Sequence, residues 1–239
     1  MILNFGRKNK ITVLQAEIVV IHLHTTLTRM YKSIILLSAL TLFWFACNDD
    51  SSGNDPAVYD PTPYTLNYGN FPTPDIPSDN KPTVAGVQLG RMLFYEKKLS
   101  KTGTMACADC HRQKDGFSDS LRFSIGVENL PGKRQAMAVM NMAWHANGLF
   151  WDGRSPSMRD QALKPIQDPL EMNETLQNAV AKISGEKKYR DQFIRAFGDD
   201  TVTAERIGLA IEQVESTMIS FNSKYDRVLA GKDSLTSSE

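Results

Sequence analysis

Cysteine and histidine are scarce in this sequence, with three cysteines and four histidines among 239 residues. No stretch alternates apolar and polar residues over more than a few positions, which argues against β-strands and hence against a sheet-based fold. An excess of charge is also missing, because 27 basic side chains balance 27 acidic ones. A net charge of zero lacks the basic surplus typical of nucleic-acid-binding proteins, so we expect no nucleic-acid partner.

The apolar run at residues 34–45 is shorter than the roughly 20 residues that a membrane-spanning helix needs. It follows the basic residue Lys32 and leads to Ala46, which is the layout of a secretory signal peptide. We interpret residues 1–46 as a signal region and Met30 as the candidate true start.

Cys47 follows directly and precedes the polar stretch "NDDSSGND". A small residue before a lone cysteine resembles a bacterial lipoprotein cleavage site, although "WFAC" departs from its usual pattern. An ordinary signal peptide with an incidental cysteine is the alternative. Because each buried methylene of an acyl chain contributes roughly 0.8 kcal/mol, lipid on Cys47 would hold the protein on a membrane. We expect export to the periplasm or cell envelope, with this lipid as an anchor to a bacterial membrane.

Residues 47–82 are rich in proline, glycine, asparagine, aspartate and serine, and we interpret them as an extended tether. The aromatic residues Tyr64, Tyr68 and Phe71 are candidates to pin part of this tether to a domain surface.

Residues 83–239 show helical spacing of apolar residues, and we interpret them as the folded domain. A first helix is expected to begin after Thr83, and the longest is expected after Thr203, with both threonines as N-caps. The further expected helices cover residues 134–144, 157–163, 174–183 and 187–197, and the longest covers 204–222. The fold class is therefore all-α, with long structured loops between the helices.

The stretch "MACADCHRQKDGFSD" places Cys107 and Cys110 directly before His111 in a C-x-x-C-H pattern. A structural zinc site needs four ligands, and the chain offers only Cys47 and His145 as further soft ligands. A thioredoxin-like redox pair expects a βαβ setting, which is missing. Covalent attachment of c-type haem needs two thiols for the vinyl groups and a histidine for the iron, and it takes place outside the cytoplasm. We expect one covalent haem c, with His111 as the proximal iron ligand.

The opposite face of the iron decides between two functions. An electron carrier closes that face, commonly with methionine, and Met105, Met172 and His145 are candidates here. An enzyme leaves the face open for a substrate and places an acid–base group nearby.

Several blocks occur in an order that resembles the bacterial di-haem cytochrome c peroxidases and the related maturation enzymes of methylamine dehydrogenase. They are "LGRMLFYEKKLSKTGTMACADCHRQKDGFSD", "SIGVENLPGKR", "FWDGR", "QALKPIQDPLEM" and "FNSKYDRVLAGKDSLTSSE". The resemblance runs from about Tyr64 to the end. It implies a cytochrome c-like fold that corresponds to the family's N-terminal, peroxide-reacting haem domain.

The resemblance implies a role for each of three further residues. Glu171 in "PLEM" matches the family's distal catalytic glutamate, and Gln161 matches a glutamine of its distal pocket. Trp151 in "FWDGR" matches the tryptophan between the two haems and looks like an electron bridge. The implied partners are hydrogen peroxide and an electron donor, either a small redox protein or a second haem domain.

Three departures limit this carry-over. Val127 stands where many family members have a distal histidine, so an open sixth position is expected. Gln135 stands where an asparagine associated with a calcium site is usual, which makes calcium doubtful. The family would continue beyond Glu239 into a second C-x-x-C-H domain. The alternatives are therefore a single-haem electron carrier or a non-functional fragment of a di-haem enzyme.

The residues alone also allow simpler interpretations. Glu171 could lie in a solvated turn or cap a helix, Trp151 could be a core aromatic, and His145 could be a surface residue. In "DGR", Gly153 is expected to permit an unusual backbone angle. Three methionines, at positions 137, 140 and 142, are spaced for packing in a core.

Overall fold

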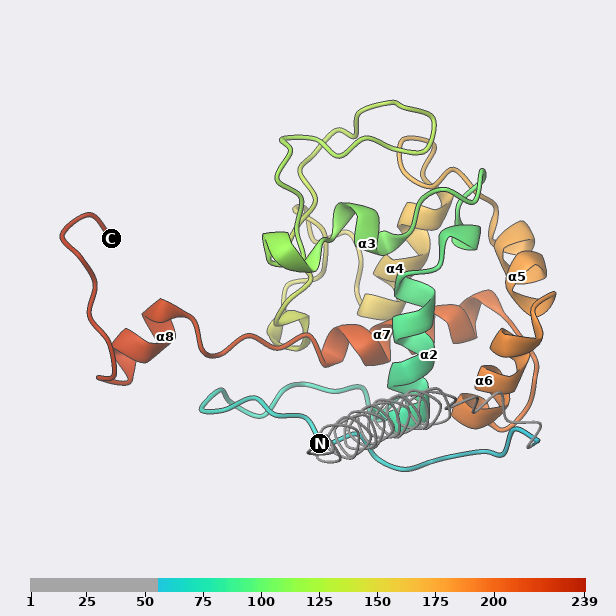
Figure 1. The fold of residues 1–239 in the computed structure, drawn as a ribbon, viewed down its shortest axis with the longest axis horizontal. Coiled ribbons are helices and arrows are strands. Elements are labelled where there is room, and N and C mark those ends of the chain that lie inside the picture. Colours follow the sequence, from blue (N-terminus) through green and yellow to red (C-terminus); the bar gives the residue numbers. More distant parts are fainter. Residues whose placement is uncertain (1–55) are drawn as a thin grey trace, which may run out of the picture. The chain divides into compact units, whose positions relative to one another are not determined.

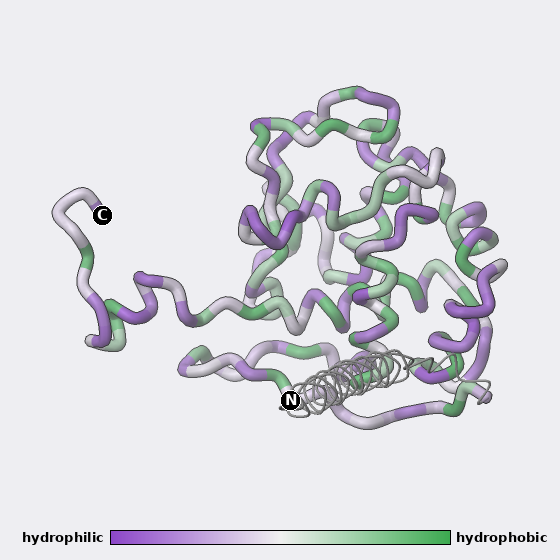
Figure 2. Tube along the Cα trace, viewed as in Figure 1, coloured by the Kyte–Doolittle hydropathy of each residue, from purple (hydrophilic) through white to green (hydrophobic). Residues whose placement is uncertain are grey.

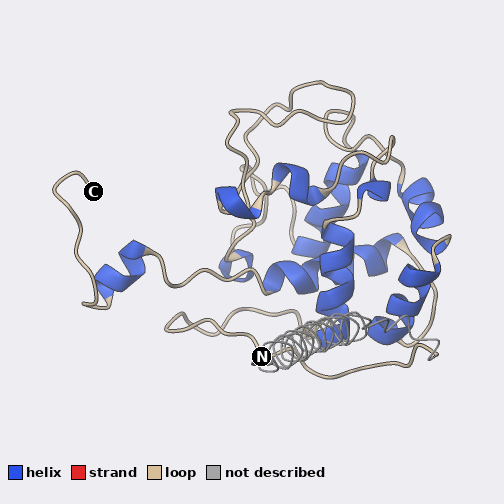
Figure 3. Cartoon of the chain, in the orientation of Figure 1, coloured by secondary structure: helices blue, strands red, loops and turns tan. Residues whose placement is uncertain are grey.

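The computed structural model describes residues 56–239. The expected signal region at residues 1–46 and the candidate lipid site Cys47 lie outside the described residues. Figure 3 shows helices and loops and no strand in the described part of the chain, as the all-α prediction requires. Among these residues, no helix combines the length and apolar character needed to cross a membrane.

Five longer helices form the body of this unit, joined by long loops and short helical turns (Figure 1). The longer helices are α2 (Val84–Phe94), α4 (Met158–Gln167), α5 (Leu176–Ser184), α6 (Lys187–Phe197) and α7 (Ala204–Ser216). The shorter elements are η1 (Lys97–Leu99), α3 (Cys107–Cys110), η2 (Gln113–Asp115), η3 (Met142–Trp144) and α8 (Lys224–Leu229).

Hydroxyl side chains fix where the helices begin. Thr83 Oγ1 accepts a hydrogen bond from the backbone N–H of Gly86 at 3.0 Å, and Thr203 Oγ1 accepts one from Arg206 at 3.1 Å. Each bond satisfies a backbone donor that has no partner inside its helix. Both predicted N-caps are confirmed.

The core lies where α2 and α7 cross, the most extensive helix contact of the described residues (Figure 1). Gly90 of α2 makes this crossing close, because a Cβ built there would lie 1.9 Å from the carbonyl oxygen of Ala210. Leu89, Leu93 and Ile211 are buried around this crossing. Hydrophobic and polar residues are mixed along the helices, as the colours of Figure 2 show, and the apolar ones recur every three to four positions, so each helix buries one face.

Two expected helix ranges are wrong. Residues 134–144 form only the short turn η3, because their backbone groups bond to other segments instead of to each other. Val139 N–H donates to the Phe117 carbonyl at 3.2 Å, and Asn141 N–H donates to Met218 at 2.8 Å. The longest helix ends at Ser216, and Ser220 N–H instead donates to the side chain of Asn141 at 2.8 Å.

Residues 56–82 run along the domain without forming a helix. Tyr64 N–H donates to the Pro82 carbonyl at 2.9 Å, and the indole N–H of Trp144 donates to the Pro72 carbonyl at 2.9 Å. The ring of Phe71 meets Trp144 edge-on, with their centroids 5.3 Å apart. These contacts hold this stretch to the helical body.

A buried ion pair joins α4 to α7. Glu212 is 1% exposed, and its Oε2 lies 2.7 Å from Arg159 Nη2. Asn80 Nδ2 donates to the same oxygen at 2.7 Å, and Arg159 also binds Asp79 at 2.6 Å. The charge of Glu212 is therefore compensated although it lies in the interior.

The Arg159→Ala variant should lower the free energy of unfolding by about 3 kcal/mol, because it leaves the Glu212 carboxylate buried without a cation. Urea unfolding of the haem-loaded protein measures this loss. Arg206→Ala is the matched control, since its partner Asp199 is exposed and such pairs contribute about 1 kcal/mol or less. Equal losses in the two variants would contradict the role of the buried pair.

Candidate functional site: a haem cavity

A cavity of about 750 Å³ opens between α3, α4, the C-terminal end of α7 and the loops around residues 132–154. Volumes of this order are typical of sites for cofactors and other small molecules. Val139, Met142 and Leu149 supply apolar walls. A smaller extension of about 40 Å³ reaches inward beside Phe94 and Cys107.

Helix α3 brings the two thiols to this cavity. Cys107 and Cys110 are one helical turn apart, and both line the inner extension. Both cysteines are free thiols, so no disulfide competes with their use. Burial is the main cause that raises the pKa of Cys107 to about 12 and the pKa of Cys110 above its usual value. The sulfurs are therefore protonated thiols in this apolar setting.

His111 follows α3 directly and lines the same cavity. Its Nδ1 lies 3.2 Å from the carbonyl oxygen of Phe117, so Nδ1 carries the hydrogen and donates it. Burial lowers the pKa of His111, although the carbonyls of Phe117 and Met137 act in the opposite direction. The imidazole is therefore neutral, and Nε2 keeps the lone pair that a metal needs.

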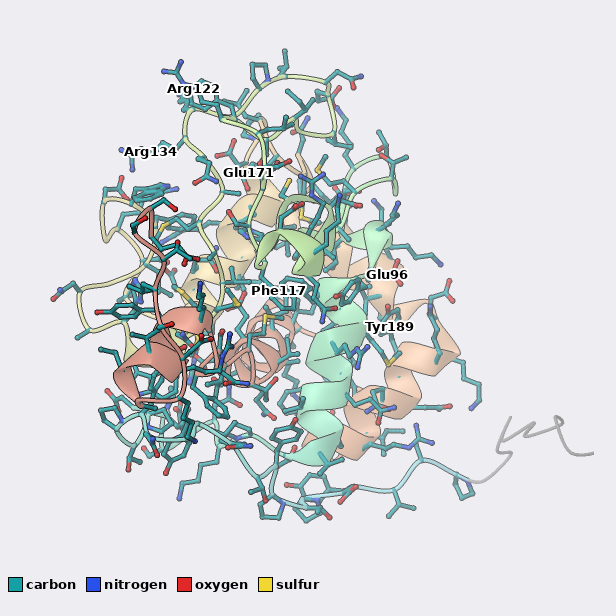
Figure 4. The ribbon with its side chains drawn as sticks, turned by 60° about the vertical axis from the view of Figure 1, so that its left-hand side comes forward. Glu96, Phe117, Arg122, Arg134, Glu171 and Tyr189 are labelled. Carbon is teal, nitrogen blue, oxygen red and sulfur yellow. The ribbon has the colours of Figure 1, made fainter. Side chains whose placement is uncertain are left out.

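The loop after His111 holds this carbonyl in place. Arg112 N–H donates to Ser118 at 3.0 Å, and the Arg112 side chain binds Asp119 at 2.8 Å. Phe117 adopts a positive φ of 53°, which turns its backbone toward the imidazole. Figure 4 shows Phe117 next to α3.

Glu171 reaches the cavity from the loop that follows α4. Its backbone N–H donates to Asp168 at 3.0 Å, and its carbonyl accepts from Val127 at 2.7 Å. Burial raises the pKa of Glu171 to about 7, and the charge of Asp168 adds to this while Arg154 opposes it. Glu171 thus lies in a turn, as the simpler interpretation expected, but it lines the cavity and is only partly exposed, and the N-cap of the next helix is Thr175.

Val127 does not line the cavity, and its backbone N–H bonds the loop that carries Glu171. Its neighbour Gly126 allows the two loops to meet, because a Cβ there would lie 2.0 Å from the Leu170 carbonyl oxygen. The "SIG" segment thus supports the loop that carries Glu171.

The other two expected site residues also line the cavity. Gln161 lies on α4 and is half-buried. Trp151 is 61% exposed at the mouth, where its indole N–H donates to the Gln135 carbonyl at 2.9 Å. The interpretation of Trp151 as a core aromatic is wrong. Gly153 has a φ of +68°, as expected from the "DGR" turn.

Basic residues gather at the same mouth. Lys133, Arg134 and Arg154 line the cavity there. Asp152, which also lines it, pairs with Arg134 at 2.8 Å and with Arg154 at 2.9 Å, so Lys133 is the cation of this group that forms no ion pair among the described residues. Arg122 and Arg134 stand at the outer edge of the loops in Figure 4, with Glu171 further in.

The candidates for a sixth iron ligand lie in different places. His145 is exposed and lies outside the cavity lining, which agrees with its interpretation as a surface residue. Met105 and Met172 line only the inner extension. Of the three core methionines, Met137 and Met142 line the main cavity.

The residue expected at a calcium site is engaged within the protein. The side-chain amide of Gln135 donates to Ser118 Oγ at 3.2 Å and to the Asp119 carbonyl at 2.9 Å. In the described range, no cluster of three or more His, Cys, Asp and Glu side chains could hold a metal ion.

The cavity fits a c-type haem. Cys107 and Cys110 would bond the vinyl groups at the inner edge, and His111 Nε2 would bind the iron. The basic mouth suits the two propionates, and the apolar walls suit the porphyrin faces. Fold and site together define a c-type haem domain.

The chain belongs to the family of di-haem cytochrome c peroxidases, whose profile matches residues 84–234. MauG, the methylamine utilization protein of Methylophilus methylotrophus, is 35% identical over 166 residues, which cover 68% of this chain and 49% of that protein. Cytochrome c551 peroxidase of Nitrosomonas europaea is 38% identical, with coverage of 64% and 46%.

Solved structures agree with this assignment. A MauG-like protein associated with microbial copper homeostasis superposes with a TM-score of 0.66 at 32% identity, covering 73% of this chain and 52% of that one. The di-haem peroxidase BthA from Burkholderia thailandensis shares the fold, with a TM-score of 0.57 at 21% identity. The chain spans about half the length of the curated relatives it matches.

The sequence did not identify Glu215 as a cavity residue. Glu215 of α7 lines both the main cavity and its extension. Its position four residues after Ile211 places it on the apolar stripe of the helix, and this spacing could have indicated that its side chain is buried.

Proposed function

We propose that this domain reduces hydrogen peroxide at one covalent haem c with an open distal position. The observation that carries this proposal is Glu171, a half-buried carboxyl on the cavity wall to which no described residue donates a side-chain hydrogen bond. Its pKa of about 7 suits a group that must both take and return a proton near neutral pH.

The bound haem would supply a redox-active iron with an exchangeable coordination position. Glu171, when ionised, accepts a proton from the near oxygen of peroxide and returns it to the departing oxygen as the O–O bond breaks. Gln161 orients the peroxide, and Trp151 at the mouth passes electrons inward. The balance is one peroxide, two electrons and two protons to two waters, with the electrons from a small redox protein or a second haem domain.

We extend this proposal to the location of the protein in the cell and to the binding of calcium. The sequence around Cys47 supports export to the cell envelope with a lipid anchor on a bacterial membrane. We propose no calcium ion at Gln135, because a glutamine stands there where the resemblance associates an asparagine with calcium.

The absorption spectrum of the ferric, haem-loaded protein tests the open distal position. We expect a high-spin spectrum, because Val127 cannot ligate iron and His145 lies outside the cavity. A low-spin spectrum with a methionine-to-iron band would contradict the proposal and favour a single-haem electron carrier.

A further inference from the structure

Two glutamates of α7 are buried but differ in their partners. Glu212, 1% exposed, is bonded to Arg159 and Asn80. Glu215, 5% exposed, receives no side-chain hydrogen bond and no ion pair within residues 56–239. The Glu215 carboxyl therefore opens onto the cavity, where a bound group would cover it, and its position calls for a functional reason.

Glu215 lies at the inner edge of the haem cavity. It lines both the main cavity and the extension that holds Cys107. Its charge contributes to the raised pKa of the Cys107 thiol, whereas the charge that acts on His111 comes from Asp119. The carboxyl thus shares the extension with the sulfur that would bond the porphyrin edge, and it shares both spaces with His111.

No side chain of α2, α4 or η3 that lines these spaces is a cation, and α5, which also packs against α7, lines neither of them. The cations of the main cavity, Lys133, Arg134 and Arg154, come from the loops around it. From α2 the cavity receives Phe94, and from η3 it receives Met142, both apolar. From α4 it receives the neutral amide of Gln161, while Arg159 of that helix is engaged by Glu212. The other acidic residues of the main cavity are Asp152, Asp168 and Glu171, and of these Glu171 lines the extension as well.

Burial raises the pKa of Glu215 to about 8, and the charge of Glu212 adds to this. The carboxyl therefore exchanges its proton in the neutral range. In a medium of low dielectric constant, a change of one unit charge nearby strongly changes the free energy of its ionised form.

We propose that Glu215 is the redox-linked proton-binding residue of the haem site. It takes up one proton from water when the iron gains one electron from a one-electron donor, and it releases that proton when the iron loses the electron. The step converts ferric iron and a carboxylate into ferrous iron and a carboxylic acid. Its cause is the positive charge that the iron loses on reduction, which no longer stabilises the carboxylate. This proposal rests on the haem of the proposed function but not on its peroxide chemistry.

The experiment is a spectroelectrochemical titration of the haem-loaded protein between about pH 6 and pH 9. A proton bound with each electron makes the midpoint potential fall by up to about 59 mV for each tenfold drop in proton concentration. We expect this slope in the wild type, its loss in Glu215→Gln and its retention in Glu215→Asp. Glu128→Gln is the matched control, because it removes an exposed carboxyl outside the cavity and should keep the slope.

If the midpoint potential of Glu215→Gln kept its full pH dependence, the proposal would be overturned, and the proton would be assigned to the propionates or to Glu171. A wild-type potential that does not change with pH would also overturn it. Should Glu215→Gln fail to load haem, the infrared difference between reduced and oxidised wild type still decides. A protonated-carboxyl band that appears on reduction and shifts in Glu215→Asp supports the proposal, and its absence overturns it. Because neither readout uses peroxide, a sloping potential without peroxide turnover would contradict the proposed function alone.

Discussion

The Glu171→Gln variant should keep its covalent haem and lose peroxide turnover by a factor of roughly 10²–10⁴, which is the usual contribution of a positioned acid–base group. The amide that replaces the carboxyl can donate a hydrogen bond but cannot accept and return a proton. The cavity wall keeps its shape, since glutamine has nearly the same size. The measurement is steady-state peroxide consumption with a saturating one-electron donor, together with the absorbance of the attached haem.

The pH profile separates this acid–base role from a structural one. Wild-type turnover should fall as the pH drops through about 7, because protonation removes the ionised acceptor form of Glu171. The residual turnover of Glu171→Gln should lack this step. Glu128→Gln is the matched control, because Glu128 is an exposed carboxyl that bonds Lys101 and Asn173 outside the cavity. Equal turnover in wild type and Glu171→Gln would remove Glu171 from the mechanism.

The helices that were predicted well carry their signals locally. Thr83 and Thr203 begin α2 and α7 through bonds to residues three positions later, so the sequence window contains both partners. The segment 134–144 shows the opposite case. Its bonds go to Phe117 and to the chain after α7, and no local pattern reveals such distant partners.

The candidate site divides in the same way. The thiols and His111 are neighbours in the chain, and their spacing alone predicts covalent haem attachment. The loop that carries Glu171 is held in part by Val127, which is far from it in sequence and bonds its backbone. The indole of Trp151 likewise bonds the backbone of a residue distant in sequence, Gln135. In the sequence, nothing distinguishes Glu215 from the other polar residues of its helix. The fold places it in the inner extension together with Cys107.

The double variant Cys107→Ser, Cys110→Ser should lose covalent haem completely when it is made in a host competent for cytochrome maturation. A hydroxyl does not form the thioether to a vinyl group, and the cavity holds no other described cysteine that could replace it. The apolar walls of the cavity would then face water, which should also loosen the fold. Mass spectrometry of the denatured chain measures the attached haem, and urea unfolding measures the loss of stability.

The two single variants provide a graded control, because either remaining thiol can form one thioether. Each should still carry one haem mass after denaturation. His111 would keep its bond to Phe117 in all three variants, since neither cysteine takes part in that contact. A coloured, acid-stable chain from the double variant would show that the haem is bonded elsewhere. That result would contradict the geometry on which the roles of His111, Glu171 and Glu215 depend, because the thioethers fix which edge of the porphyrin points inward.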